Sequence, residues 1–290
     1  MSNIQFVKDY RDNEELRGSF NELAKNTFGL DFEDWYQNGY WKDNYNPHSI
    51  VVDGKVVANV SVNLTDFIWK GERKRLIQLG TVMTEEAYRK KGYIRMIMEE
   101  IQKEYAGKVD GIYLFANNEV LDFYPKFGFK RAQQYEYVKT QEIQTKATVE
   151  QILMKDKAAW DMLEQKIKAN EHSCAFDMIE NSALNMFYIT KFMQENVFYE
   201  ASMDAYIVAE VEEDELIIDM VIAKEDVDLN RAAEAFGRDI KKVKLGFTPK
   251  DTTGFTMQEV DQDDSMLFVK GEGLADFTEE KLTFPLLAHA

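Results

Sequence analysis

The sequence is poor in cysteine, proline and histidine. Its 290 residues include one cysteine, Cys174, four prolines and three histidines. A single cysteine cannot form an internal disulfide, which excludes the small secreted proteins that disulfides hold together. The scarcity of proline, together with 45% apolar and 30% charged residues, excludes collagen-like, proline-rich and disordered chains. Neither a long uncharged apolar run nor a secretory apolar segment is present, so we expect a soluble cytoplasmic protein without a membrane span.

Patterns that hold metals or common nucleotide cofactors are also missing. His48, His172 and His289 have neither paired cysteines nor an H-E-x-x-H spacing around them, so we predict no metal site. Neither half opens on G-x-G-x-x-G or on G-x-x-x-x-G-K-[ST], which are the glycine patterns of dinucleotide and P-loop sites. Cys174 has no basic motif beside it that would activate its thiol, which argues against a nucleophilic role.

Acidic residues strongly exceed basic ones. With 52 acids against 35 bases, the formal net charge is −17, which disfavours nucleic acid and anionic membranes as partners. The excess lies in one half: residues 1–140 hold 21 acids and 20 bases, and residues 141–290 hold 31 acids and 15 bases. This asymmetry predicts two domains, 1–140 and 141–290, with a boundary near the polar stretch Thr140 to Thr148. A well-solvated surface is the alternative explanation of the acidic half.

Hydrophobic periodicity predicts a mixed α/β domain in the first half. Asp53-Gly54 between two β-branched runs is typical of a hairpin turn, and apolar residues recur at helical spacing from Ile94 to Tyr105. The expected order is a helix (16–28), an aromatic loop, three strands (49–52, 55–62, 75–83), a helix (94–105), a strand (111–116), a short helix (118–124) and a last strand (130–139).

The second half repeats this order more weakly. We expect helices (149–168, a stretch up to 193, 230–236), a hairpin (205–211 with 216–223) and strands (175–179, 242–247, 265–270). The recurrence of hairpin, helix, strand, glycine-aromatic turn and strand indicates an internal duplication. Its helix follows the acidic run Lys224 to Asp228, whose carboxylates would repel phosphate. This copy is therefore predicted to bind no anionic cofactor.

One short segment of the first half gathers positive charge. Arg89, Lys90, Lys91 and Arg95 surround Gly92 where a strand gives way to a helix. Unpaired backbone N–H groups and the positive end of the helix dipole favour a pyrophosphate at such a place, and glycine allows its close approach. A solvated helix start is the plainer alternative.

The run from Val82 to Ile94 resembles the acetyl-coenzyme A binding motif of the GNAT N-acetyltransferase superfamily, [QR]-x-x-G-x-[GA]. Arg89, Gly92 and Ile94 occupy its three defined positions, although Ile94 is larger than the residue usual at the last one. The segment Asn117 to Phe129 is similar to the family's second motif, an Asn followed by Phe-Tyr and then Gly-Phe.

A large residue at Ile94 followed by Arg95 is similar to the Eis-like branch, which pairs a working GNAT domain with a degenerate second one. The resemblance implies a duplicated GNAT acyl-CoA N-acyltransferase fold and direct transfer of the acetyl group from acetyl-CoA, the co-substrate, to an amine. It implies coenzyme-binding roles for Val82, Met83, Thr84, Arg89, Lys90, Lys91, Gly92, Tyr93, Ile94, Arg95 and Asn118.

The same resemblance implies a catalytic role for Tyr124, which matches the tyrosine that protonates the departing thiolate. A core tyrosine packed beside Phe123 and Phe127 is the alternative. The general base stays unassigned: Glu119 and Asp122 lie near the motif, and each is as consistent with a solvated helix end.

Aromatic residues after the first helix are the candidates for the wall of the acceptor site, Trp35, Tyr36 and Trp41 among them. Aromatic faces and carboxylates both suit cations. We therefore expect a cationic amine acceptor, either an aminoglycoside-like or polyamine small molecule or a lysine-bearing peptide. The alternative function is a non-catalytic acyl-CoA-binding sensor or interaction protein.

Overall fold

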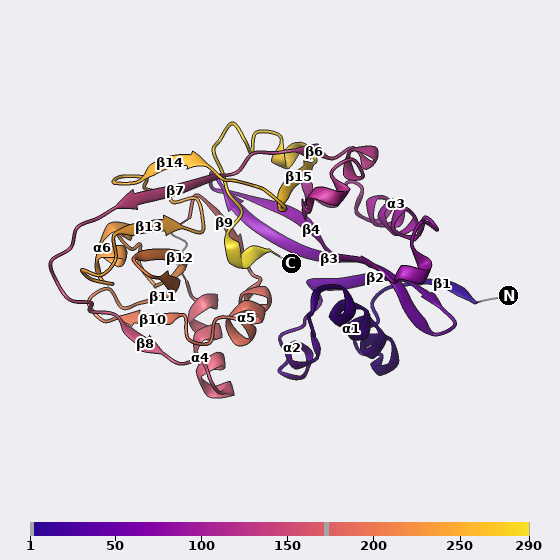
Figure 1. The fold of residues 1–290 in the computed structure, drawn as a ribbon, viewed down its shortest axis with the longest axis horizontal. Coiled ribbons are helices and arrows are strands. Elements are labelled where there is room, and N and C mark those ends of the chain that lie inside the picture. Colours follow the sequence, from indigo (N-terminus) through magenta and orange to yellow (C-terminus); the bar gives the residue numbers. More distant parts are fainter. Residues whose placement is uncertain (1–2, 171–173, 290) are drawn as a thin grey trace.

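Two mixed β-sheets with helices packed on them make up the computed structural model, which describes residues 3–170 and 174–289 (Figure 1). His172 lies outside these residues. The first sheet has the order β1-β2-β3-β4-β5-β15-β6, with β9 paired to β3. Its strands are β1 (Ile4–Val7), β2 (Tyr45–Val52), β3 (Lys55–Trp69), β4 (Glu72–Thr84), β5 (Gly111–Ala116), β6 (Lys130–Arg131), β9 (Phe176–Ile179) and β15 (Met266–Lys270).

The predicted hairpin of the first half is confirmed. β2 and β3 pair antiparallel around Asp53 and Gly54, whose φ angles of 49° and 87° are those that a tight hairpin turn between twisted strands requires. The sequence pattern missed β1, which pairs with β2.

Two helices cover opposite faces of this sheet. Helix α1 (Glu14–Phe28) packs on the face that carries Val51 and Val56, and α3 (Tyr93–Tyr105) packs on the face that carries Val52 and Val57. Neighbouring residues of one strand point to opposite faces of the sheet, so β2 and β3 contribute side chains that pack against both helices. The aromatic loop contains a short helix, α2 (Glu33–Gln37). A 3₁₀ turn, η1 (Glu86–Tyr88), joins β4 to the start of α3.

Parallel strands β4 and β5 separate before they end. They pair only from Leu76 with Gly111 to Gln78 with Tyr113, although β4 continues to Thr84 and β5 to Ala116. Beyond that point β4 also contains a β-bulge opposite β3, between the pairs of Asn59 with Met83 and Ser61 with Gly80. A bulge bends its strand, so the end of β4 is redirected where the two strands part.

The second sheet has the order β14-β7-β13-β12-β11-β10-β8. Its strands are β7 (Tyr135–Thr140), β8 (Glu150–Ile152), β10 (Val197–Glu200), β11 (Ala205–Glu212), β12 (Glu215–Ile222), β13 (Lys242–Leu245) and β14 (Thr256–Glu259). The helices of this half are α4 (Lys157–Lys168), α5 (Ser182–Lys191) and α6 (Leu229–Glu234). Two 3₁₀ turns, η4 (Glu272–Leu274) and η5 (Leu286–Ala288), lie near the C-terminus.

The duplicated topology is present in three dimensions. In the first half the hairpin β3–β4 is followed by α3 and by β5, which is parallel to β4. In the second half the hairpin β11–β12 is followed by α6 and by β13, which is parallel to β12. Both halves therefore contain an antiparallel hairpin, a crossover helix and a strand parallel to the end of the hairpin.

Several predicted elements need correction. The strand predicted at 130–139 is two strands in different sheets, β6 and β7, and the helix predicted at 149–168 begins only at Lys157, after β8. The short helix predicted at 118–124 is two 3₁₀ turns, η2 (Asn118–Val120) and η3 (Tyr124–Phe127), because proline at 125 has no N–H for a continuing α-helix.

The two sheets exchange strands. From the first half, β7 pairs with β13 of the second, and from the second half, β15 pairs with β5 of the first. Hydrogen-bond ladders thus tie both halves together, although the division into domains 1–140 and 141–290 stays a prediction. None of the helices in the described part of the chain combines the length and apolar character needed to cross a bilayer.

Candidate active site

A cleft of about 520 Å³ lies where β4, the start of α3 and the η2 and η3 turns meet. It is lined by Tyr124 and by all but one of the residues predicted to bind the coenzyme, namely Val82, Met83, Thr84, Arg89, Lys90, Lys91, Gly92, Tyr93, Ile94 and Arg95. Segments that are separate in the sequence thus share one cavity. The predicted coenzyme residue outside its lining is Asn118.

The N-terminus of α3 presents unused backbone donors to this cleft. The first helical hydrogen bond runs from the N–H of Met96 to the carbonyl of Gly92, at 3.1 Å, which leaves the N–H groups of residues 93–95 without a partner inside the helix. Gly92 caps the helix at φ 82° with no side-chain hydrogen bond. An anion placed at this end is held by free N–H groups and by the helix dipole.

Four cations surround the same helix start. Arg89, Lys90, Lys91 and Arg95 are exposed, and no ion pair to any of them exists within residues 3–170 and 174–289. The Lys91 ammonium lies 4.3 Å from the ring centre of Tyr88. Because no carboxylate neutralises them, these side chains keep their charge for a ligand.

The end of β4 provides a second set of backbone groups. Since β5 has parted from β4 beyond Gln78, no strand among the described residues pairs with the edge of β4 that faces β5 from there to Thr84. The bulge here puts Thr81 at φ 42°, and Arg89 donates from Nε to the Thr84 carbonyl at 3.4 Å. Amide-bearing ligands can add to such an open strand edge.

A buried polar network fixes the bulge, and sequence reasoning missed it. Asn59 donates from Nδ2 to the Thr81 carbonyl at 2.9 Å, and the Tyr45 hydroxyl lies 2.8 Å from the Thr81 hydroxyl. Ser49 donates to the other end of the Asn59 amide at 2.8 Å. The available signal was the alternation of polar residues, Asn59, Ser61 and Asn63, with valines in one strand, since buried polar groups in strands need partners.

Tyr124 lines the cleft and is 4% exposed. Its ring packs against Phe129 and Phe268, with centres 6.2 Å and 5.7 Å away. Burial raises the pKa of Tyr124 to about 12, so the phenol keeps its proton at neutral pH. No residue in the described part of the chain hydrogen-bonds its hydroxyl. Phe268 comes from β15, so the second half helps to hold Tyr124.

Asn118 and Glu119, two polar residues of η2, face different parts of the structure. Asn118 turns toward the second half: its side-chain amide donates to Asp263 at 2.7 Å and its backbone N–H to Asp264 at 3.0 Å. Glu119, the next residue, lines the cleft. The predicted coenzyme contact of Asn118 stays a prediction, and its observed partners are these two carboxylates.

The acceptor-site role of Trp35, Tyr36 and Trp41 stays a prediction, and the structure shows what these residues contact. Trp35 and Trp41 are 5% and 3% exposed, and their indole N–H groups donate to the carbonyls of Ala183 and Tyr45, both at 2.9 Å. The Tyr36 ring is covered by the Arg17 guanidinium at 3.8 Å. The structure therefore places both indoles in the core, where they join the first sheet to α5, and none of the three lines the cleft of Tyr124.

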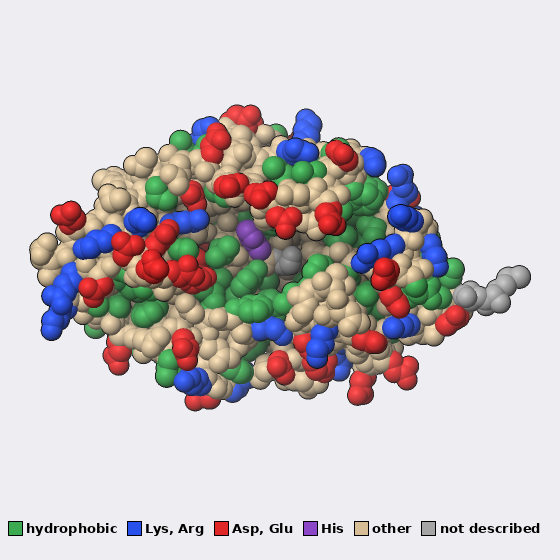
Figure 2. Space-filling view, viewed as in Figure 1, with side chains coloured by type: hydrophobic (Ala, Val, Ile, Leu, Met, Phe, Trp, Pro, Cys, Tyr) green, Lys and Arg blue, Asp and Glu red, His purple; other side chains and the backbone are tan. Residues whose placement is uncertain are grey.

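One face of the molecule has a hollow with acidic side chains beside it. Figure 2 shows acidic side chains along the rim of a hollow near the centre of this face, while basic ones are scattered over its periphery. A field of this sign attracts cations to the hollow. Within residues 3–170 and 174–289, no group of three or more His, Cys, Asp or Glu side chains is arranged to hold a metal ion.

Comparison with known proteins identifies part of the chain. The family model "Acetyltransferase (GNAT) domain" matches residues 45–131, a span from β2 to β6 that contains the cleft's β4, α3 and Tyr124. No curated protein matches the sequence significantly.

Solved structures resemble nearly the whole chain. A conserved protein from Enterococcus faecalis V583, titled a probable N-acyltransferase, has a TM-score of 0.62 at 14% identity over 92% of this chain and 72% of its own. A GCN5-related N-acetyltransferase from Kribbella flavida has a TM-score of 0.58 at 16% identity over 92% and 71%. Eis1 from Mycobacterium abscessus has a TM-score of 0.54 at 12% identity over 92% and 73%. At these identities the likeness shows a shared fold.

Proposed function

We propose that this protein, whose residues 45–131 form a GNAT acetyltransferase domain, transfers the acetyl group of acetyl-CoA directly to a primary amine of a cationic acceptor. The family match supports acyl transfer as the reaction and acetyl-CoA as the co-substrate. One observation carries the assignment to this cleft: the free N–H groups of α3, four unpaired cations and Tyr124 meet in a single cavity.

The cleft residues divide the work by position. The N–H groups of residues 93–95 and the neighbouring cations would hold the pyrophosphate of the coenzyme. The open edge of β4 from Val82 to Thr84 would pair with the amides of its pantetheine arm. A backbone N–H at this edge, fixed by the network on Thr81, would stabilise negative charge on the thioester oxygen as the amine attacks.

Tyr124 would supply the proton that the leaving thiolate needs. A general acid must carry its proton at the working pH, and a pKa of about 12 meets this condition. Because its hydroxyl has no partner in the described chain, the proton is available to a group in the cleft. When the nitrogen of the neutral amine bonds to the acetyl carbon and the carbon–sulfur bond breaks, the phenol proton passes to sulfur. The nitrogen loses one proton to solvent, and solvent returns a proton to the Tyr124 phenolate.

The cationic character of the acceptor is the finer part of the proposal. It is supported by the 31 acids against 15 bases of residues 141–290 and by the acidic rim of the central hollow. Aminoglycoside-like amines, polyamines and lysine-bearing peptides share an ammonium group that such a field attracts.

Two measurements test this function. Calorimetry with desulfo-coenzyme A reports occupation of the cleft without turnover, and we expect binding that Gly92→Ala weakens. Release of free thiol from acetyl-CoA, measured over a panel of cationic, neutral and acidic amines, reports transfer. Turnover confined to neutral or acidic amines contradicts the cationic acceptor. Binding without turnover of any amine would instead identify an acyl-CoA sensor.

A further inference from the structure

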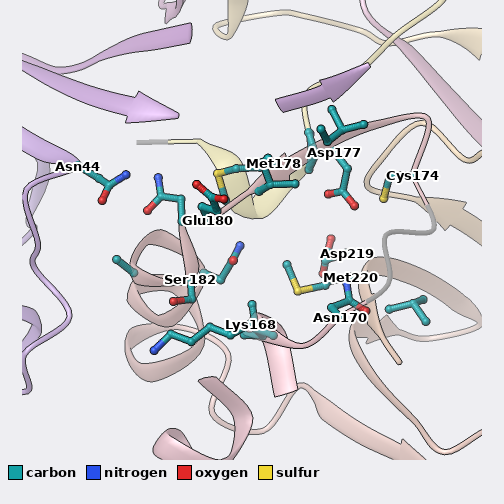
Figure 3. Close-up of a pocket in the computed structure, with 18 of the residues that line it drawn as sticks. Asn44, Lys168, Asn170, Cys174, Asp177, Met178, Glu180, Ser182, Asp219 and Met220 are labelled. Atoms are coloured by element: carbon teal, nitrogen blue, oxygen red, sulfur yellow. The ribbon is translucent and has the colours of Figure 1, made fainter. Parts of the chain in front are cut away.

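A second pocket lies between the two sheets and shares no lining residue with the cleft of Tyr124. Its volume is about 530 Å³. The lining comes from the loop before β2, the end of β3, α4, β9, the start of α5, and β12. Figure 3 shows this pocket, with polar side chains from both halves of the chain pointing into it.

Asp219 is an unpartnered buried carboxylate in this pocket. The residue is 2% exposed, and neither of its carboxylate oxygens has a hydrogen-bond partner in the described structure. Burying an ionised carboxylate without a partner is costly. An unsatisfied buried carboxylate in a cavity requires an explanation. A ligand that donates hydrogen bonds to the carboxylate would explain it.

The backbone directs this side chain into the cavity. Asp219 is the extra residue of a β-bulge in β12, because Met220 pairs with Val208 whereas Ile218 pairs with Ala209. A bulge re-aims the side chain it carries. Gly246, which follows β13, leaves space for the Asp219 side chain, because a Cβ at position 246 would lie 2.9 Å from the Asp219 carboxylate.

This bulge occupies the same place in its half as the bulge at Thr81 does in the first. In both halves it follows the last parallel pair, Gln78 with Tyr113 in one and Ile218 with Leu245 in the other. The second copy thus has a bulge at the matching point of its hairpin, and the bulged residue there carries a carboxylate.

The other groups of the pocket suit a cation. Figure 3 shows the side chains of Asp177 and Asp219 pointing toward one another across the cavity. The two lysines of the lining, Lys42 and Lys168, both face Glu164, at 3.4 Å and 2.9 Å, so this carboxylate offsets part of their positive charge. Asn170, Asn181 and Ser182 also line the space, where the Asn170 side-chain oxygen accepts from the Ala223 N–H at 2.8 Å and the Ser182 hydroxyl donates to Glu164 at 3.1 Å.

We propose that this pocket binds a small organic cation, whose ammonium or amidinium group donates hydrogen bonds to the Asp219 carboxylate. The site stands apart from the acetyl-CoA cleft and does not depend on the proposed transferase activity. A donor-rich cation of this kind satisfies both carboxylate oxygens at once.

Proton release should accompany binding. Burial raises the pKa of Asp219 to about 8, with a contribution from Glu210 against the opposing effect of Lys244. The other charged or titratable groups of the lining are Lys42, Lys168, Cys174, Asp177 and Glu180. Asp219 must ionise to bind a cation. Because an acid with this pKa is mostly protonated at pH 7 and mostly ionised at pH 9, the affinity for the cation should be roughly tenfold weaker at pH 7 than at pH 9.

The test uses the full chain and 1,4-diaminobutane as the probe, with 1,4-butanediol as its uncharged analogue. Calorimetry at pH 7 in buffers of different ionisation enthalpy measures both affinity and released protons. The matched variants are Asp219→Asn, which keeps the shape of the side chain, and Glu212→Gln, which removes an exposed charge of the same hairpin.

We expect the diamine to bind the wild type and Glu212→Gln with equal affinity and to release protons in both cases. Its affinity for Asp219→Asn should be at least tenfold weaker, and no proton release should accompany that binding. The circular dichroism and melting temperature of Asp219→Asn establish that it is folded. Equal binding to Asp219→Asn, equal binding of the diol, or competition by desulfo-coenzyme A would overturn the proposal. The last result would place the diamine in the other cleft and leave the proposed function intact.

Discussion

Replacing Tyr124 by phenylalanine removes one hydroxyl from the cleft and leaves the ring packing in place. The hydroxyl has no hydrogen-bond partner in the described chain, so its removal orphans no buried group. We expect the free energy of unfolding to change by less than about 1 kcal/mol. The contacts with Phe129 and Phe268 are retained, and the affinity for desulfo-coenzyme A should stay the same.

The rate should behave differently. A positioned general acid contributes roughly 10²–10⁴ in rate, which corresponds to about 3–5 kcal/mol of transition-state stabilisation. Single-turnover thiol release from bound acetyl-CoA should therefore slow by at least ~10² in Tyr124→Phe. Tyr88→Phe is the matched control, because Tyr88 lines the same cleft but its ring lies beside the Lys91 ammonium.

The pH dependence provides an independent check. With a folded-state pKa of about 12, Tyr124 remains protonated throughout the accessible range, so its ionisation should cause no loss of rate up to about pH 10. A wild-type single-turnover rate that falls above pH 8, with the fall absent in Tyr124→Phe, would contradict this. An unchanged rate in Tyr124→Phe at neutral pH would refute the acid role outright and return the residue to the core.

Three further predictions concern the rest of the domain. Gly92→Ala forces a side chain into φ 82°, which costs about 1–2 kcal/mol and should raise the dissociation constant of desulfo-coenzyme A several-fold in calorimetry; unchanged affinity would exclude this turn as the anion site. Trp35→Phe removes the hydrogen bond to Ala183 and should lower the free energy of unfolding by about 1–3 kcal/mol in urea titrations, with the KM for acetyl-CoA unchanged; a raised acceptor KM without loss of stability would return Trp35 to the acceptor site. Burial tends to raise the pKa of Asp66, but its hydrogen bonds from Arg75 and Arg73 prevail and lower it, so its contribution to stability is present above pH 4 and is lost as the pH falls further. Asp66→Asn should accordingly be less stable than the wild type at pH 7, and the difference should shrink toward pH 3.

Local patterns determined the parts of this protein whose contacts are close in sequence. The turn at Asp53-Gly54 and the apolar stripe of α3 depend on neighbouring residues, so the hairpin and the helix could be read directly. The cationic glycine turn is equally local, because its chemistry comes from residues 89–95. The aligned position of Tyr124 followed from resemblance to a family.

Tertiary structure alone decided which groups meet across long sequence separations. The residues predicted at 130–139 show no local sign that they divide between two sheets, since that depends on pairing with β13 and β15, more than 100 residues away. The aromatic residues near Trp35 suit a core and a cleft wall equally well, and only their packing against α5 buries them. Asp219 is unremarkable in sequence, yet a one-residue bulge and the close approach of Gly246 leave it buried and unpartnered, because register and packing between distant strands fix where a side chain points.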